Sequence, residues 1–349
     1  MSKKSFLASV ALLTVASPAI AQAPDDQTLY PGGHWEPGPA RYGSVNGEVS
    51  IPMDDGVILQ ASVAWPTDPK TGKRASGTFP VVIEHQPYTH LAVPTAPLSF
   101  FPEHGYIYLL VHSRGTGQSG GEIQYVSPRD GEDGRAIVDW AATKLDGSDG
   151  RLALFGCSFP GGTALMDAAH LDAGSPVKAI VAACNGFNSQ NRGSFMRSGM
   201  DTGNVPTMAS AMPDLVGNTP SAKAFFPRVA HEIEAGGDAA YDRDFWQQRL
   251  VTKLAEPIVK SGIPILLWSG WRDHVDGPLR TWTALQNVAA GRPAGAPMTQ
   301  QQMPTPRYQL VMTDQAHAQG LDLGIFLECE NGGAIFVHAS GGIVPLRAA

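Results

Sequence analysis

The stretch Leu152-Ala-Leu-Phe-Gly-Cys-Ser-Phe-Pro-Gly-Gly162 decides the fold of this chain. Its first four residues are apolar and predict a buried strand, and the residues after Gly161 predict a helix. Ser158 lies at the turn between them, flanked by Gly156 and Gly161, which lack the Cβ atoms that would crowd so sharp a turn. The stretch therefore predicts a strand that turns directly into a helix and holds a serine hydroxyl above the edge of a sheet.

Short apolar runs recur along the rest of the chain and alternate with helical patterns. The runs are Glu48–Met53, Val57–Trp65, Phe79–Ile83, Tyr106–Val111, Leu152–Phe155, Val177–Ala183, Ile263–Trp268 and Tyr308–Met312. The helical patterns are Asp133–Thr143, Gly162–His170 and Leu279–Ala290. Asp54-Asp55-Gly56 between the first two runs is a hairpin signal. Because strands that alternate with helices pair through right-handed crossovers, we expect a doubly wound, mostly parallel α/β sheet that begins antiparallel.

The interval 185–260 interrupts this alternation. It shows no clear strand pattern but contains helical stretches such as Ala222–Glu234 and Asp244–Glu256. Its length far exceeds the usual connection between a helix and a strand, so we expect a helical cap inserted into the sheet domain. Ordinary crossover helices are the alternative. The expected segments are a signal peptide (1–21), a Pro/Gly-rich lead (22–47), the first part of the sheet domain (48–184), the cap (185–260), the second part of the sheet domain (261–330) and an irregular tail (331–349).

The first residues have the pattern of an export signal. Two lysines at positions 3 and 4 precede the apolar run Phe6–Val15, and Ala19-Ile20-Ala21 forms a small-residue cleavage site. The apolar run is shorter than the ~20 residues that a membrane-spanning helix needs. We therefore expect residues 1–21 to be removed and the mature protein to be secreted or periplasmic, with no membrane contact after removal.

Charge and cysteine content narrow the function classes. The chain has 32 acidic and 25 basic residues, for a net charge of −7, which argues against nucleic-acid binding. Its cysteines are Cys157, Cys184 and Cys329, an odd number that allows one bridge at most. Cys157 and Cys184 end two apolar runs and could pair on neighbouring strands, although buried free thiols are the expected state.

No cofactor or metal is expected. His231-Glu232 lacks the second histidine of the H-E-x-x-H zinc motif, and no Cys/His cluster has zinc spacing. Gly115, Gly117 and Gly120 satisfy G-x-G-x-x-G after a strand, but residues 123–128 intervene before the next helical pattern. A dinucleotide site needs a helix that opens directly at the glycines, so this motif is assigned to a loop.

Two further residues complete a catalytic hypothesis around Ser158. A serine hydroxyl needs a base and a carboxylate that orients the base, in the chain order Ser, Asp, His, each just beyond a strand. Asp273 follows the run Ile263–Trp268, and His317 follows the run Tyr308–Met312. These positions predict a Ser158, Asp273, His317 triad.

Some neighbouring residues compete for these roles. Asp276 and Asp314 are second choices for the carboxylate. Four more histidines lie near strand ends and would either line the pocket or form hydrogen bonds within loops: His85, His90, His112 and His274.

Taken together, the motifs resemble the cocaine esterase and Xaa-Pro dipeptidyl-peptidase group of α/β-hydrolases. The resemblance rests on Asp55-Gly56-Val57, Pro80-Val81-Val82 with Pro87-Tyr88, His104-Gly105-Tyr106, Arg114-Gly115-Thr116-Gly117-Gln118-Ser119-Gly120-Gly121, Asp139-Trp140, Gly156 to Gly161 and Gly270-Trp271-Arg272-Asp273. It implies an α/β-hydrolase fold in which Ser158 is the nucleophile, His317 the base and Asp273 its orienting carboxylate. By the same resemblance, the Tyr88 hydroxyl and the Phe159 backbone N–H bind the oxyanion.

The chain also departs from that group. His112 stands where the group usually has aspartate, so the ion pairs near Arg114 should differ. Many members continue into a large β-sandwich domain, for which we expect no room after His317.

The expected function is a serine hydrolase that cleaves a small-molecule carboxylic ester through an acyl-enzyme. An amide or peptide hydrolase on the same triad is the first alternative, and a truncated, non-catalytic homologue is the second. The stretch Cys184–Arg192 contains no acid, which argues mildly against recognition of a free amino group. The sequence leaves the oligomeric state open.

Overall fold

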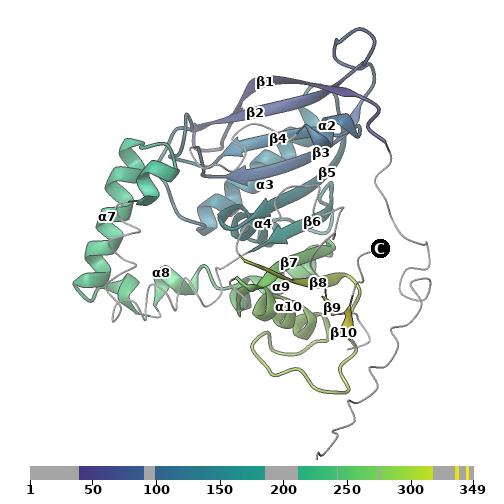
Figure 1. The fold of residues 1–349 in the computed structure, drawn as a ribbon. Coiled ribbons are helices and arrows are strands. Elements are labelled where there is room, and N and C mark those ends of the chain that lie inside the picture. The colour runs from purple at the N-terminus through teal and green to yellow at the C-terminus, as the bar shows by residue number, and fades with distance from the viewer. Residues whose placement is uncertain are drawn as a thin grey trace, which may run out of the picture. The chain divides into compact units, whose positions relative to one another are not determined.

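One sheet organises the described part of the chain. The computed structural model describes residues 39–89, 99–184, 211–241, 243–273, 276–316, 335–337 and 343–345. Ten strands lie in the order β1-β2-β4-β3-β5-β6-β7-β8-β9-β10 (Figure 1). Their bounds are β1 Gly43–Pro52, β2 Ile58–Thr67, β3 Phe79–Gln86, β4 Ile107–His112, β5 Ser148–Cys157, β6 Val177–Ala183, β7 Ile265–Arg272, β8 Tyr308–Ala316, β9 Ile335–Val337 and β10 Ile343–Pro345. The expected signal peptide lies outside the described residues.

The centre of the sheet is parallel and its two ends are antiparallel. β1 pairs with β2 and β2 with β4 in antiparallel fashion, as the predicted hairpin requires. The strands from β4 through β3, β5, β6 and β7 to β8 are parallel. The structure thus confirms the predicted α/β-hydrolase type of fold, in which consecutive crossovers build a mixed, mostly parallel sheet.

Beyond β8 the structure differs from the irregular tail expected for residues 331–349. β9 pairs with β8, and β10 pairs with β9, both antiparallel. Ile335, Val337, Ile343 and Val344 supply β-branched side chains that favour extended backbone. These short strands extend the sheet past β8, which contains the last apolar run predicted as a strand.

Four helices cover one face of the sheet, and α2 lies on the other. Their bounds are α2 Phe100–Glu103, α3 Pro128–Thr143, α4 Phe159–Ala169, α9 Val251–Ser261 and α10 Asp276–Ala289. Ile137, Leu165, Ile258 and Leu285 of α3, α4, α9 and α10 join the strands in the main apolar core. A smaller cluster, which includes Tyr108 and Phe155, lies on the face of α2.

Helix α3 begins five residues before the predicted start. Ser127 accepts hydrogen bonds from the Arg129 and Asp130 N–H groups, and the Asp130 carboxylate accepts one from the Ser127 N–H. This reciprocal capping box, with Pro128 at the first helical position, fixes the start. The sequence-based pattern missed it because the first turn contains no apolar residue of the helical period.

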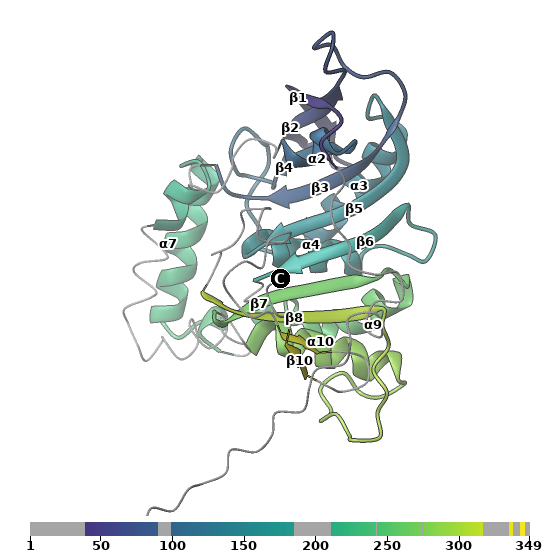
Figure 2. The ribbon, with the colours of Figure 1, turned by 45° about the vertical axis from the view of Figure 1, so that its right-hand side comes forward.

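Part of the expected cap can be described. It contains α7 Pro220–Glu234, the 3₁₀ turn η1 Asp238–Ala240 and α8 Asp244–Gln247. Figure 2 shows α7 beyond the carboxyl ends of β3, β5 and β6. The expected helix Asp244–Glu256 is divided into α8 and α9, and α9 packs against α4 and α10. Residues 185–210 of the cap lie outside the described ranges. Across those ranges, no helix is long and apolar enough to span a bilayer.

Candidate active site

Ser158 occupies a sharp turn between β5 and α4. Cys157 is the last residue of β5 and Phe159 is the first of α4. Ser158 has φ 65° and ψ −124°, a conformation that costs free energy for a residue with a side chain. Its N–H donates to the Ala183 carbonyl at 3.0 Å, which ties the turn to the end of β6. The geometry is that of a strained nucleophile elbow.

The glycines around Ser158 are required by close packing. A Cβ atom on Gly156 would collide with the backbone of Pro160, and one on Gly161 would collide with the Ala183 carbonyl. Neither obstacle is a flexible side chain, so a substitution would have to move the backbone. Gly161 therefore lets α4 approach β6 closely.

Tyr88 reaches the elbow from the end of a neighbouring strand. Its hydroxyl oxygen lies 3.5 Å from the Ser158 Oγ atom, and the Phe159 backbone N–H also bonds the tyrosine oxygen. The Tyr88 and Phe159 rings meet edge to face, with centroids 6.1 Å apart. Burial raises the pKa of Tyr88, so the phenol stays protonated at neutral pH. A phenol O–H and a backbone N–H converge beside Ser158, as an oxyanion hole requires.

Asp273 lies just past the end of β7, where the sequence analysis expected it. Its Oδ2 atom accepts a hydrogen bond from the Ser269 hydroxyl at 3.1 Å, and its N–H donates to the Gly270 carbonyl at 3.1 Å. Its charge also acts on Cys157, the residue before the elbow serine. Asp273 therefore lies on the same edge of the sheet as the elbow.

The expected base, His317, lies outside the described residues. The preceding residue, Ala316, ends β8 and pairs with Arg272 of β7. The register between these strands shifts after Gly270, a β-bulge of the kind found beside active sites. Of the alternative carboxylates, Asp276 begins α10 and Asp314 belongs to β8. Like His317, the histidines at positions 90 and 274 lie outside the described residues.

His85 and His112 belong to strands rather than to loops. His85 is 3% exposed within β3, and its Nδ1 atom lies 3.2 Å from the Asp167 Oδ2 atom. His112 ends β4, and burial lowers its pKa. The expectation that His85 either lines the pocket or forms hydrogen bonds within a loop is wrong. His85 lies within β3, and alternation along the strand turns its side chain toward α4.

An aromatic group behind the elbow was not predicted. Tyr125 meets the rings of Phe159 and Phe226 edge to face, at centroid distances of 5.2 and 5.9 Å. Its backbone has φ 59°, and Arg249 holds its carbonyl through Nε at 2.7 Å. These contacts connect α7 and the segment after α8 to the elbow. The sequence carries no signal for them, since a left-handed tyrosine and a buried arginine are set by tertiary contacts.

The glycine-rich loop after β4 serves packing in this structure. A Cβ atom on Gly115 would collide with the Ile123 backbone, and the Gly115 N–H donates to the Gly120 carbonyl at 2.9 Å. Arg114 forms ion pairs with Asp55 and Asp133, each at 2.7 Å. Among the residues that the structure describes, no group of three or more His, Cys, Asp and Glu side chains could hold a metal ion.

Comparisons with known proteins agree with this geometry. The sequence profile of the X-Pro dipeptidyl-peptidase family (S15 family) matches residues 55–319. Comparison with curated protein sequences gives no significant match.

Solved structures of similar fold include hydrolases of several kinds. A CocE/NonD family hydrolase from Staphylococcus aureus is 20% identical, with a TM-score of 0.53, over 68% of this chain and 44% of that one. An alpha-amino acid ester hydrolase is 19% identical, with a TM-score of 0.52, over 87% and 52%. An esterase from Pyrococcus furiosus is 16% identical, with a TM-score of 0.50, over 83% and 90%. The chain thus spans about half the length of the first two proteins.

Proposed function

Since the chain belongs to the X-Pro dipeptidyl-peptidase (S15) family of hydrolases, we propose that it cleaves carboxylic esters with Ser158 as nucleophile, His317 as base and Asp273 as orienting carboxylate. The observation that carries this proposal is the contact between the Tyr88 hydroxyl and Ser158 Oγ at the strained elbow. A structural serine would need neither the positive φ nor a half-buried phenol beside its hydroxyl. The proposed hydrolysis needs no cofactor.

The reaction follows from the placement of these groups. His317 takes the Ser158 proton as Oγ attacks the ester carbonyl, and the carbonyl oxygen becomes an oxyanion. The Tyr88 O–H and the Phe159 N–H stabilise that charge. His317 then returns the proton to the departing alcohol, and an acyl-enzyme remains. Water activated by His317 releases the acid and restores Ser158.

The aromatic surroundings support an uncharged substrate group near the elbow. Tyr88, Phe159, Tyr125 and Phe226 belong to one apolar cluster with α7. A free ammonium group would need a carboxylate partner in such surroundings. This favours esters without a charged amine as substrates.

An amide or peptide bond is the second candidate, because the matched family is described as a peptidase family. The same acyl group presented as a nitrophenyl ester and as a nitroanilide separates the two. Because serine peptidases also cleave activated esters, the anilide decides: ester hydrolysis without measurable cleavage of the anilide supports the ester proposal, whereas efficient cleavage of the anilide supports the peptidase.

Substitution of the proposed nucleophile tests the function directly. We expect Ser158→Ala to lower turnover of nitrophenyl esters by at least about 10⁴-fold, as removal of a triad nucleophile does. Ser50→Ala, at an exposed position of β1, serves as the matched control and should keep wild-type turnover. Wild-type turnover by Ser158→Ala would overturn the proposal.

We further propose that residues 1–21 direct export and that the mature protein acts outside the cytoplasm. N-terminal sequencing of the protein recovered from periplasm or medium should begin at Gln22. Recovery of the chain in the cytoplasm with its first residues intact would contradict the export proposal and leave the catalytic one standing.

A further inference from the structure

The two proposed oxyanion donors come from different elements. Tyr88 follows β3, whereas the Phe159 N–H belongs to the first turn of α4. Their separation therefore depends on how α4 sits against β3, and these two elements pack directly on each other. A fixed contact between β3 and α4 would set the distance between the donors.

A buried pair of side chains supplies such a contact. His85 of β3 places Nδ1 at 3.3 and 3.2 Å from the two carboxylate oxygens of Asp167 in α4. Both side chains are 2% exposed. The other ring nitrogen of His85, Nε2, is buried and has no hydrogen-bond partner within the described ranges of the chain. Among the described residues, Asp167 is thus the hydrogen-bond partner that holds the imidazole.

The positions of the pair along the chain connect it to both donors. His85 precedes Tyr88 by three residues, and Asp167 lies on the same helix as Phe159, about two turns further on. Backbone hydrogen bonds hold both the end of β3 and the short helix α4. A shift of one residue in either element therefore also moves the residues close to it. Moving His85 away from Asp167 would move Tyr88 relative to the Phe159 N–H.

Packing leaves Asp167 little freedom to turn away from His85. A Cβ atom on Gly134 of α3 would overlap the Asp167 carboxylate, so α3 and α4 touch at this point. On the next turn, a Cβ atom on Gly131 would overlap the His170 ring. Two glycines on one face of α3 therefore let it press Asp167 against the sheet.

The charges around the pair favour an ionised histidine. Burial lowers the pKa of His85, but the charges of Asp167, Asp130 and Asp133 raise it, and the net shift is upward. Burial raises the pKa of Asp167, which His85 and the more distant His170 oppose.

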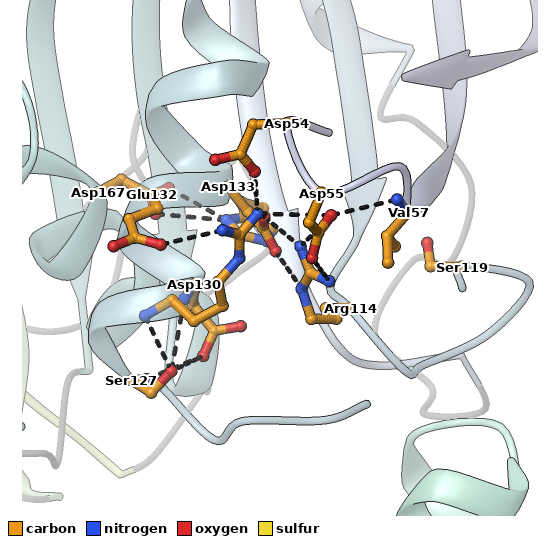
Figure 3. Close-up of polar contacts among 12 residues, drawn as sticks. Asp54, Asp55, Val57, Arg114, Ser119, Ser127, Asp130, Glu132, Asp133 and Asp167 are labelled. Carbon is orange, nitrogen blue, oxygen red and sulfur yellow. Dashed lines mark hydrogen bonds and ion pairs between the residues drawn. The ribbon is translucent and has the colours of Figure 1, made fainter. Parts of the chain in front are cut away.

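Asp130 and Asp133 of α3 are held by other groups. Figure 3 shows Asp133 bonded by arginine side chains and Asp130 bonded by Ser127. Arg249 also acts on Asp130 through its charge. Asp167 is therefore the aspartate left to bond His85.

We propose that His85 and Asp167 are a positioning pair that fixes the Tyr88 hydroxyl relative to the Phe159 N–H. Neither residue touches the reacting atoms. The inference rests on the proposed function, because the geometry of two donors matters only if they stabilise an oxyanion together. It predicts that the pair acts on kcat, and that it does so through Tyr88.

A double-mutant cycle tests this coupling. Asp167→Asn should lower kcat for a nitrophenyl ester by about tenfold to a hundredfold with KM within about twofold, since small misplacements at a reacting centre have effects of that size. In the Tyr88→Phe background, where only one donor remains, Asp167→Asn should lower kcat by less than about threefold. An equal loss in both backgrounds, or a rise in KM at constant kcat, would overturn the proposal.

Variants of His85 distinguish loss of the contact with Asp167 from a simple folding defect. His85→Asn keeps an amide N–H near the position of Nδ1, from which it can reach Asp167, and should retain most of kcat, whereas His85→Leu should lose it to the same extent as Asp167→Asn.

Glu84→Gln is the matched control, because Glu84 is buried on the same strand but on the opposite face. Its effect should be additive with that of Tyr88→Phe. Equal kcat in the Asn and Leu variants of His85 would also overturn the proposal. If the proposed function itself is wrong, a different result will show it, because ester hydrolysis will then survive Ser158→Ala.

Discussion

The hydroxyl oxygens of Tyr88 and Ser158 lie 3.5 Å apart although 70 residues separate them in the chain. The contact follows from the order of the sheet. β3 and β5 are parallel neighbours with Ile83 opposite Leu154, so their carboxyl ends reach the same edge. Tyr88 follows one strand and Ser158 the other, which brings a proton donor to a proposed nucleophile without any long loop.

Removal of the Tyr88 hydroxyl should therefore weaken turnover more than binding. We expect Tyr88→Phe to lower kcat for a nitrophenyl ester by about 10²- to 10³-fold, the usual effect of losing one oxyanion donor. KM should change little, because the ground-state carbonyl needs the donor less. Tyr241→Phe, at an exposed position, is the control and should behave as wild type. Steady-state kinetics that show unchanged kcat would assign Tyr88 to packing.

The elbow should be intolerant of a methyl group at Gly161. Gly161→Ala would force the Ala183 carbonyl to move, and such overpacking costs about 1–3 kcal/mol of the free energy of unfolding. Gly295→Ala is the matched control, because no atom lies within contact distance of its Cβ position. Urea unfolding should show the loss at position 161 and little change at 295. Equal midpoints for the two variants would contradict the packing described around Ser158.

Strand positions and the elbow could be predicted because they depend on local sequence. The apolar runs around Val81, Leu109 and Leu154 are buried on both faces of a parallel sheet, which leaves a continuous hydrophobic signal. Ser158 between two glycines is equally local. The profile of the X-Pro dipeptidyl-peptidase family matches residues 55–319, the range that contains these motifs.

Other parts of the site depend on contacts that a single sequence does not display. His85 and Asp167 are 82 residues apart and meet only when α4 packs on β3. The left-handed backbone of Tyr125 is held by Arg249, 124 residues away. Local propensity opposes a positive φ at tyrosine, so no pattern of neighbours could have predicted it.

Glu84 should make stability fall as the pH rises. Burial raises its pKa to about 7 from an ordinary 4.5, and the Tyr108 hydroxyl donates to its carboxylate. The folded state thus holds a proton that the unfolded state releases above about pH 4.5. The stabilisation is complete below that pH and is lost as the pH rises through about 7, a change of about 3 kcal/mol at most.

Glu84→Gln removes this titration while keeping a neutral side chain of the same shape. The melting temperature of the variant should therefore vary less between pH 4.5 and 7 than that of the wild type. The two proteins should differ least at the acid end, where Glu84 is protonated in both folded and unfolded states. Parallel pH profiles for the variant and the wild type would show that Glu84 does not titrate in this range.

The Cys157 thiol, beside Ser158, should resist alkylation. Cys157 and Cys184 are both free and buried, and the hydrogen bond between them, together with burial, raises the pKa of Cys157. Little thiolate forms at pH 8, and the thiolate is the reactive species. Peptide mapping after brief iodoacetamide treatment should find Cys157 unmodified in the folded protein and modified after unfolding in urea. Rapid alkylation of the folded protein would contradict its burial.

Active-site labelling tests the central claim most directly. A fluorophosphonate bonds covalently to a serine only where a base activates the hydroxyl and an oxyanion hole receives the phosphoryl oxygen. We expect one equivalent of label per folded chain, mapped to the peptide that contains Ser158, slower labelling in Tyr88→Phe and none in Ser158→Ala. A folded protein that takes up no label, or that carries it on another residue while Ser158→Ala is still labelled, would contradict the assignment of Ser158 as the nucleophile.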